Sequence, residues 1–341
     1  MELWVKTLSI RIVLTLLLIG LTSSVQAQVD DGHNGVGAIL ERIEHIFESG
    51  CPEGSHNNPW ICAADYRKQL AEHNDGVVAG IQARIARSDA SPLNTFLLFC
   101  LRERNTPDVD QLLLNYYFDR PALSKTAQGE LQARARLGHP VGVRVSEERL
   151  AHLITSVNTG SIGEAGDGAQ LLAILPKNPI DERCPPVVKR FVKAVGEPNP
   201  AIAAHHAYMP PRYLVLNWFL QAFEDFGEAA QPYLRKAVQD TPPAQAEETK
   251  WLSIALGMTS DSEQTSKLEK LVRDDADTHL RYLAILAYAK AGGEKTIPTL
   301  QSWLNDESTS DFYREPDGSS FYPIRAASKR ALALMKMELG G

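Results

Sequence analysis

Residues 281–306 decide the fold, and they read RYLAILAYAKAGGEKTIPTLQSWLND. The first half carries apolar side chains at the helical spacing of three and four residues, and it ends at a Gly-Gly pair where a helix stops readily. A second, shorter apolar segment begins around Pro298 and ends before Asp306. This stretch therefore predicts two helices that turn back on each other as a hairpin.

The same order of helix, glycine, helix and aspartate recurs through the C-terminal third of the chain. Pro232 with Leu234 and Pro298 with Leu300 are equivalent pairs that lie 66 residues apart (298 − 232), which is two units of 33. A unit of this length cannot bury its apolar face alone and must stack on its neighbours. We therefore predict an all-α fold, specifically an α-solenoid of helical hairpins.

These repeated segments resemble HEAT repeats of the short bacterial type. The resemblance rests on the motifs in residues 281–293, 297–306 and 324–332, and the last of these reads IRAASKRAL. It extends over residues 212–338 and is weak over residues 77–120. HEAT-like repeats generally hold another protein or peptide along a curved surface, so the resemblance implies a scaffold or adaptor.

The N-terminus has the three parts of a secretory signal. Lys6 and Arg11 precede an apolar run of about ten residues, and Val25 and Ala27 suit the positions before a cleavage site. We expect residues 1–27 to be removed and the protein to be periplasmic or extracellular. An uncleaved anchor is the alternative, although a membrane span needs roughly 20 apolar residues. No integral membrane segment is expected after cleavage.

The remaining chain is predicted to divide into two helical regions. Residues 28–200 form an N-terminal helical region with an irregular middle and possible divergent repeats, and residues 201–341 form the HEAT-like array. Four glycines within residues 160–168 are predicted to form a flexible connector, because their order matches neither a dinucleotide fingerprint nor a phosphate-binding loop.

The predicted export makes disulfides possible for the four cysteines, because disulfides persist in oxidising compartments. Cys51 and Cys62 flank a turn-rich segment, and we predict a disulfide between them. A metal site that also uses His56 is the alternative, although its spacing matches no common zinc pattern. Cys100 lies on the apolar stripe of a predicted helix and is expected to be a packed thiol. Its pairing with Cys184 is left open.

Composition limits the classes of partner. The 341 residues carry a formal net charge of −7 and 7% aromatic residues, so no nucleic-acid partner is expected. With 44% hydrophobic residues, the chain has enough apolar material for a folded core. The acidic stretch 261–277 is interpreted as a solvated face, with a basic partner as the alternative.

No catalytic motif is evident, and we expect neither an enzymatic activity nor a cofactor. The iron-dependent HEAT hydroxylases carry paired His-Glu dipeptides, whereas none of the nine histidines here is followed by glutamate. The alternative function is a helical metal-binding protein or an enzyme that uses His205, His206 or the 51–62 loop. The side chains of adjacent histidines on a helix point about 100 degrees apart, so His205 and His206 are poorly placed to bind the same metal ion.

An insertion at residues 308–322 is the predicted interface. It is rich in the residue types that dominate binding hot spots. The candidates are Phe312, Tyr313, Arg314, Phe321 and Tyr322. The alternative is that these aromatic side chains fold back to cover the open end of the array, as terminal repeats require.

Overall fold

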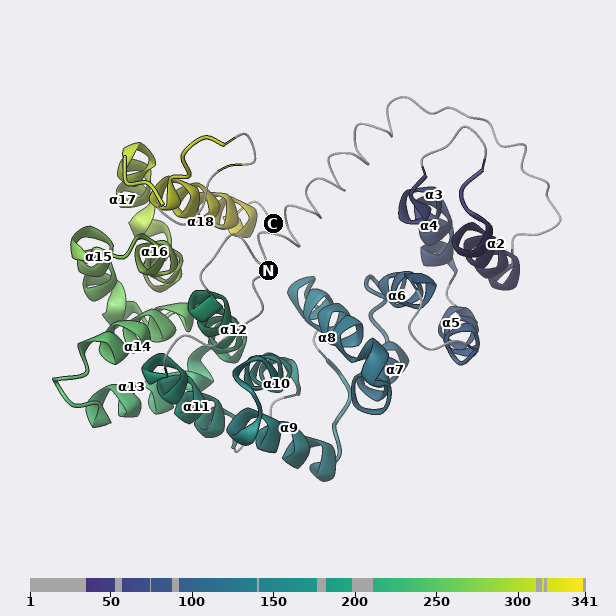
Figure 1. The fold of residues 1–341 in the computed structure, drawn as a ribbon, viewed down its shortest axis with the longest axis horizontal. Helices are drawn as coiled ribbons and strands as arrows, with labels where there is room; N and C mark the ends of the chain where they lie inside the picture. The colour runs from purple at the N-terminus through teal and green to yellow at the C-terminus, as the bar shows by residue number, and fades with distance from the viewer. Residues whose placement is uncertain are drawn as a thin grey trace. The chain divides into compact units, whose positions relative to one another are not determined.

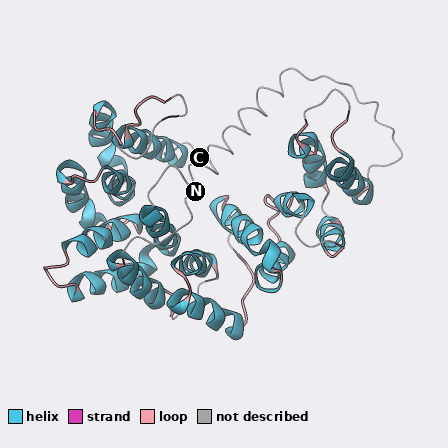
Figure 2. Cartoon of the chain, in the orientation of Figure 1, coloured by secondary structure: helices cyan, strands magenta, loops and turns pink. Residues whose placement is uncertain are grey.

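The computed structural model describes residues 35–52, 57–73, 75–87, 92–139, 141–176, 182–197, 211–310, 315 and 318–339. Helices are the regular elements of these ranges, which contain no β-strand (Figure 2). The all-α prediction is confirmed. The predicted signal peptide, residues 1–27, lies outside the described residues.

The chain divides into two compact units, Met1–Val143 and Arg144–Gly341. The described helices of the first unit are α2 (Val36–Ser49), α3 (Pro59–Cys62), α4 (Ala64–Glu72), α5 (Val77–Ile85), α6 (Pro92–Phe99), α7 (Pro107–Asp119) and α8 (Pro121–Arg136). In this unit α2 packs on α4, α5 and α6, while α8 packs on α6 and α7. Proline opens four of these helices, where its missing N–H costs no hydrogen bond.

A buried ion pair lies at the centre of the α7 and α8 packing. The guanidinium of Arg134 is fully buried, and its Nη2 lies 2.8 Å from Oδ1 of Asp110. Its Nη1 donates to the carbonyl oxygens of Leu101 and Arg104. The second carboxylate oxygen of Asp110 accepts the backbone N–H of Gly142 at 2.8 Å. One charged pair thus fixes two loops against two helices.

The second unit is built from helical hairpins. Its α-helices are α9 (Glu147–Thr159), α10 (Ile162–Ile174), α11 (Cys184–Gly196), α12 (Pro211–Phe226), α13 (Gln231–Asp240), α14 (Ala246–Met258), α15 (Thr265–Asp274), α16 (Thr278–Gly292), α17 (Ile297–Ser302) and α18 (Pro323–Leu339). Each odd-numbered helix packs on the next even-numbered one, and neighbouring hairpins meet mainly through the even-numbered helices. Figure 1 shows the even-numbered helices on the inner side of this unit and the odd-numbered helices outside.

A short 3-10 turn recurs at the same place in three hairpins. The turns η1 (Gly227–Ala230), η2 (Ser262–Gln264) and η3 (Gly293–Thr296) come directly before α13, α15 and α17. Two of them begin at a glycine with positive φ, 58° at Gly227 and 55° at Gly293, a region that favours glycine. These turns are the structural counterpart of the glycine signals in the repeated sequence.

The division between the units does not coincide with the predicted division at residues 200 and 201. The second unit begins at Arg144, and α9, α10 and α11 pack in the same two rows as the later helices. The middle that we predicted to be irregular is therefore regular from α9 onward in the described residues. The reason lies in α10, whose small residues allow α12 to approach closely.

The predicted flexible connector at residues 160–168 is wrong, because most of it is the first half of α10. A Cβ atom at Gly166 would lie 2.7 Å from Cε3 of Trp218 in α12, which is a steric clash. A Cβ atom at Gly168 would lie 3.0 Å from Cγ2 of Val157 in α9. These two glycines thus allow α10 to pack closely against α12 and α9, and they are not a sign of flexibility.

A similar close approach predicts the effect of a mutation in α14. A Cβ atom at Gly257 would lie 2.9 Å from the Cβ and 3.1 Å from the carbonyl oxygen of Ala287 in α16. Gly257→Ala is expected to lower the free energy of unfolding by about 1–3 kcal/mol through overpacking, measured by urea denaturation. Gly129→Ala in α8 is the control: no atom lies within 4 Å of its new Cβ, so stability should be unchanged or higher.

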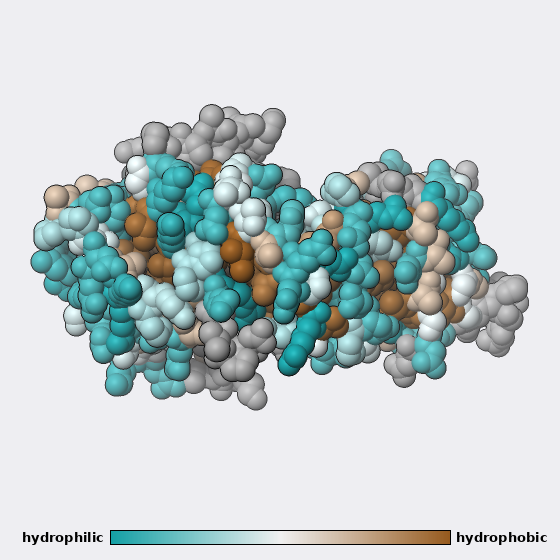
Figure 3. All heavy atoms as spheres, turned by 90° about the horizontal axis from the view of Figure 1, so that it is seen from below, coloured by the Kyte–Doolittle hydropathy of each residue, from teal (hydrophilic) through white to brown (hydrophobic). Residues whose placement is uncertain are grey.

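Hydrophilic residues cover most of the face in Figure 3, and hydrophobic residues form narrow strips between them. Among the described residues, Leu137 is the large apolar side chain that is exposed, at 54%.

Candidate functional site

Of the predicted interface at residues 308–322, the structure describes residues 308–310, 315 and 318–322. The backbone N–H of Ser310 donates to the carbonyl oxygen of Phe321 at 3.0 Å, which closes the base of the insertion. The guanidinium of Arg325 lies 4.2 Å from the ring centroid of Tyr322, a cation–π contact. Phe321 and Tyr322 are both half-buried. The other three candidates, Phe312, Tyr313 and Arg314, lie outside the described residues.

Asp306 anchors the start of this insertion to α16 and α18. Its carboxylate lies 3.1 Å from Nη2 of Arg281 and accepts the backbone N–H of Ser308 at 2.9 Å. Its carbonyl oxygen accepts Nε of Arg325. Burial alone would raise the pKa of Asp306, but the hydrogen bonds of Ser308 and the charge of Arg281 outweigh it and lower the pKa. The base of the insertion therefore stays fixed at neutral pH.

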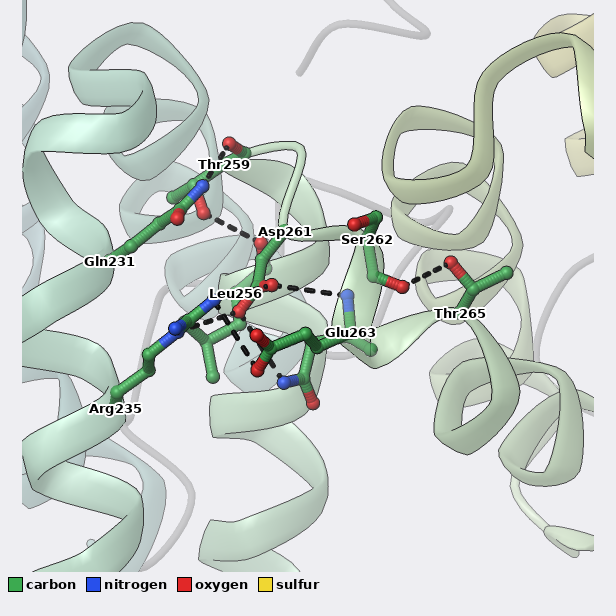
Figure 4. A network of polar contacts seen from close by, with 9 residues as sticks. Gln231, Arg235, Leu256, Thr259, Asp261, Ser262, Glu263 and Thr265 are labelled. Carbon is green, nitrogen blue, oxygen red and sulfur yellow. Dashed lines mark hydrogen bonds and ion pairs between the residues drawn. The ribbon is translucent and has the colours of Figure 1, made fainter.

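The acidic stretch 261–277, which we interpreted as a solvated face, contains buried and paired aspartates. Asp261 is 3% exposed, and its carboxylate binds Arg235 of α13 through two hydrogen bonds of 2.9 and 3.1 Å (Figure 4). It also accepts the backbone N–H of Glu263 at 3.2 Å. In the same network Gln231 donates to the carbonyl oxygen of Thr259 at 3.0 Å. Asp261 thus joins one hairpin to the start of the next.

Asp275 and Asp277 have comparable roles at the start of α16. Asp275 lies 2.5 Å from Nζ of Lys250 in α14. Asp277 is the N-cap of α16, and its Oδ1 accepts the backbone N–H groups of His279 and Leu280 at 2.9 and 3.1 Å. These carboxylates are part of the packing between hairpins, so they do not form a patch for a basic partner.

A cluster that the sequence did not predict links α12 to α16 across α14. The Tyr213 hydroxyl of α12 donates to Oδ2 of Asp277. The Tyr213 ring centroid lies 5.4 Å from that of His279 and 5.6 Å from that of Trp251 in α14. Trp251 is fully buried beneath this contact. We call Tyr213, Asp277 and His279 the α12–α16 clasp.

A second link joins the same two helices near their other ends. Nζ of Lys290 in α16 lies 2.7 Å from Oε1 of Glu224 in α12. The helix between them, α14, is buried on every side from Trp251 to Met258. The two links therefore connect α12 to α16 near both ends of these helices.

The disulfide prediction is confirmed: Cys51 and Cys62 are bonded, with Cα atoms 5.9 Å apart. Their sulfur atoms are therefore occupied, and the alternative metal site is excluded as long as the bond is intact. The third ligand of that alternative, His56, lies outside the described residues, as do His205 and His206. Within the described ranges, no group of three His, Cys, Asp or Glu side chains is placed to hold a metal ion.

The disulfide holds Trp60 in an aromatic cluster of the first unit. The Trp60 ring lies 5.2 Å from Phe96, 5.8 Å from Phe99 and 6.3 Å from Phe47, measured between centroids. All three contacts are edge-on or tilted, which are favourable arrangements. The short helix α3 is too small to be stable by itself, so the disulfide and this cluster fix its position.

Two arginines lie over the edge of this cluster. The guanidinium carbons of Arg67 and Arg102 lie 4.4 and 4.5 Å from the Phe99 centroid. Arg67 also pairs with Glu103 at 2.6 Å, and Arg102 donates two hydrogen bonds of 2.8 Å to Glu130. Phe47, Trp60 and Phe99 are half-buried, so the first unit carries an aromatic and arginine surface that the sequence did not predict.

Removing the disulfide gives a measurable loss of stability. Replacing both Cys51 and Cys62 by serine is expected to lower the free energy of unfolding by about 2–3 kcal/mol, because the unfolded chain regains the entropy of the open loop. Urea denaturation measures this loss. A reductant should destabilise the wild-type protein by the same amount and leave the double variant unchanged. Equal stability of the two proteins without reductant would contradict the prediction.

Cys100 and Cys184 are buried and are not in disulfides. Burial raises the pKa of the Cys100 thiol to about 12, against a smaller opposing effect of Arg67. The thiolate is the reactive form, so Cys100 is chemically inert at neutral pH. The expectation of a packed thiol is confirmed.

No family model, curated protein or solved structure matches this chain. Within the described residues, no helix combines the length and the apolar composition that a membrane crossing requires.

Proposed function

We propose that this protein is an exported, HEAT-like scaffold or adaptor that binds a protein or peptide in the cell envelope and does not act as an enzyme. The observation that carries the proposal is the stack of hairpins from α9 to α18. Stacked hairpins expose an extended surface and generally serve as binding platforms. Such a binding function does not require a catalytic centre.

The insertion before α18 is the proposed binding element. Its base is attached to Arg281 and Arg325, so Phe321 and Tyr322 are held in place before a partner arrives. Holding contact residues in place reduces the entropy lost on binding. The burial of α14 from Trp251 to Met258 supports the choice of this insertion over α14 as the binding element.

The N-terminal segment and the disulfide support the cellular location. Residues 1–27 have the composition of an export signal, and a disulfide between Cys51 and Cys62 is typical of proteins that leave the reducing cytosol. We therefore propose a periplasmic or extracellular location.

Photo-crosslinking in intact cells tests the binding element. A photoreactive amino acid at the exposed Ser319 should give one discrete adduct with a protein of the envelope, whereas the same amino acid at the exposed Lys236 of α13 should give none. Adding Tyr322→Ala to the Ser319 variant should abolish the adduct without changing the amount of exported protein. Equal adducts at both positions, or an adduct that survives Tyr322→Ala, would exclude the insertion as the binding element.

A further inference from the structure

The α12–α16 clasp contains one histidine, the residue type whose ordinary pKa lies closest to neutral. His279 is 15% exposed, lies against the Tyr213 ring, and has its Nδ1 3.9 Å from Oδ1 of Asp277. In contrast, the second link between these helices is an ion pair of Glu224 and Lys290 and contains no histidine. The two ends of the same contact are therefore expected to respond differently to acid.

The charges around His279 determine the direction of the response. Asp277 is the carboxylate that acts on the imidazole, and it favours the protonated form. On α14, Lys250 is paired with Asp275, and Glu247 accepts the Trp251 indole N–H at 3.0 Å.

Several charged groups on α16 and its remaining neighbours are engaged with other partners. Arg273 of α15 pairs with Glu269 at 2.7 Å. Arg281 of α16 forms an ion pair with Asp306, and Arg330 of α18 donates to the Tyr282 hydroxyl at 3.4 Å.

Burial outweighs Asp277, and the pKa of His279 is lowered from its ordinary value of 6.5. The closed clasp thus favours neutral His279, whereas an open clasp would leave the imidazole in water with its ordinary pKa. As the pH falls through the ordinary value, the open form takes up a proton more readily than the closed form. Acid must therefore shift the equilibrium toward the open form, and the shift begins at about pH 6.5.

We propose that the α12–α16 clasp is an acid-sensitive contact, in which protonation of His279 releases Tyr213 from Asp277 and loosens the first turn of α12 from the start of α16. The Glu224–Lys290 link holds the other ends of the two helices together during this opening. The proposal concerns a conformational property of the second unit and does not depend on the identity of a binding partner.

Hydrogen–deuterium exchange of the whole protein at pH 7.5 and pH 5.5 tests the proposal, with labelling times scaled for the intrinsic pH dependence of amide exchange. Peptides that cover residues 211–217 and 277–283 are expected to exchange several-fold faster at pH 5.5. Peptides that cover residues 221–226 and 287–292, around the second link, are expected to keep their protection. Unchanged protection at the clasp, or equal loss at both ends, would overturn the proposal without any variant.

Substitutions assign the response to one side chain. His279→Gln keeps a polar side chain that cannot be protonated, so the pH difference in residues 211–217 should disappear. His152→Gln in α9 is the matched control, because His152 is an exposed histidine of the same unit, and this variant should keep the full response. If His279→Gln retains the pH difference, the proposal is wrong.

Discussion

Replacing Arg134 by methionine is expected to lower the free energy of unfolding of the first unit by about 3–5 kcal/mol. The guanidinium is fully buried, and its removal leaves the carboxylate of Asp110, 3% exposed, without its counter-ion. The carbonyl oxygens of Leu101 and Arg104 also lose their donors. A buried charge without a partner costs far more than the pair itself contributes.

Urea denaturation followed by circular dichroism measures the loss, and hydrogen exchange of peptides from α7 and α8 assigns it to the first unit. Arg136→Met is the matched control, because Arg136 is on the same helix and exposed, and its replacement should change stability by less than about 0.5 kcal/mol. Equal stability of the two variants would show that the buried pair does not stabilise this packing.

Trp251→Ala is expected to lower the stability of the second unit by about 3–5 kcal/mol, because it removes a fully buried indole from the centre of α14. The cavity would lie directly beneath Tyr213, whose ring is 5.6 Å from Trp251. The indole N–H also bonds to Glu247 of the same helix. The loss should therefore combine core packing with weakening of the contact between α12 and α16.

Urea denaturation followed by circular dichroism is the suitable measurement, since the substitution also removes a fluorophore. Trp303→Ala is the control of equal size: Trp303 is half-buried and lies 5.2 Å from Tyr288, so its removal should cost clearly less. A Trp251→Ala protein as stable as Trp303→Ala would mean that α14 is not the centre of the packing.

Local patterns predicted the parts of the fold that depend on local chemistry. The hairpin of α16 and α17 follows from the apolar stripe and the glycine pair in residues 281–306. Ser146 is a residue type that favours the N-cap position, and its Oγ accepts the backbone N–H of Arg149 at 3.4 Å. The disulfide was predictable because Cys51 and Cys62 are close in sequence and flank a turn-rich loop. Membership of the HEAT family stays a prediction.

The glycines of α10 show that composition alone can predict the wrong local structure. A run of glycine suggests flexibility when only the backbone is considered, but Gly166 is required by the size of Trp218, which is 52 residues away (218 − 166). A signal was nevertheless present in the sequence. Ser161 and Glu164 have the spacing of a capping box, and in the structure each side chain accepts the backbone N–H of the other.

The α12–α16 clasp could not be predicted from sequence, because its members belong to two different hairpins and are brought together only by stacking. Nothing near Tyr213 in the sequence indicates that Asp277, 64 residues later (277 − 213), will accept its hydroxyl. The acidic stretch was misinterpreted for the same reason. Charge counting cannot tell an exposed aspartate from Asp261, whose partner Arg235 lies in the preceding hairpin.

The burial of Cys100 also bears on oxidative folding. With four cysteines, random oxidation could give three fully paired connectivities. Cys51 and Cys62 are 11 residues apart, so they meet most often in an unfolded chain. Once the core forms, the Cys100 thiol has too little thiolate to attack that bond. The native pairing is therefore favoured first by proximity and then by protection, and this chain should reach it without an isomerase.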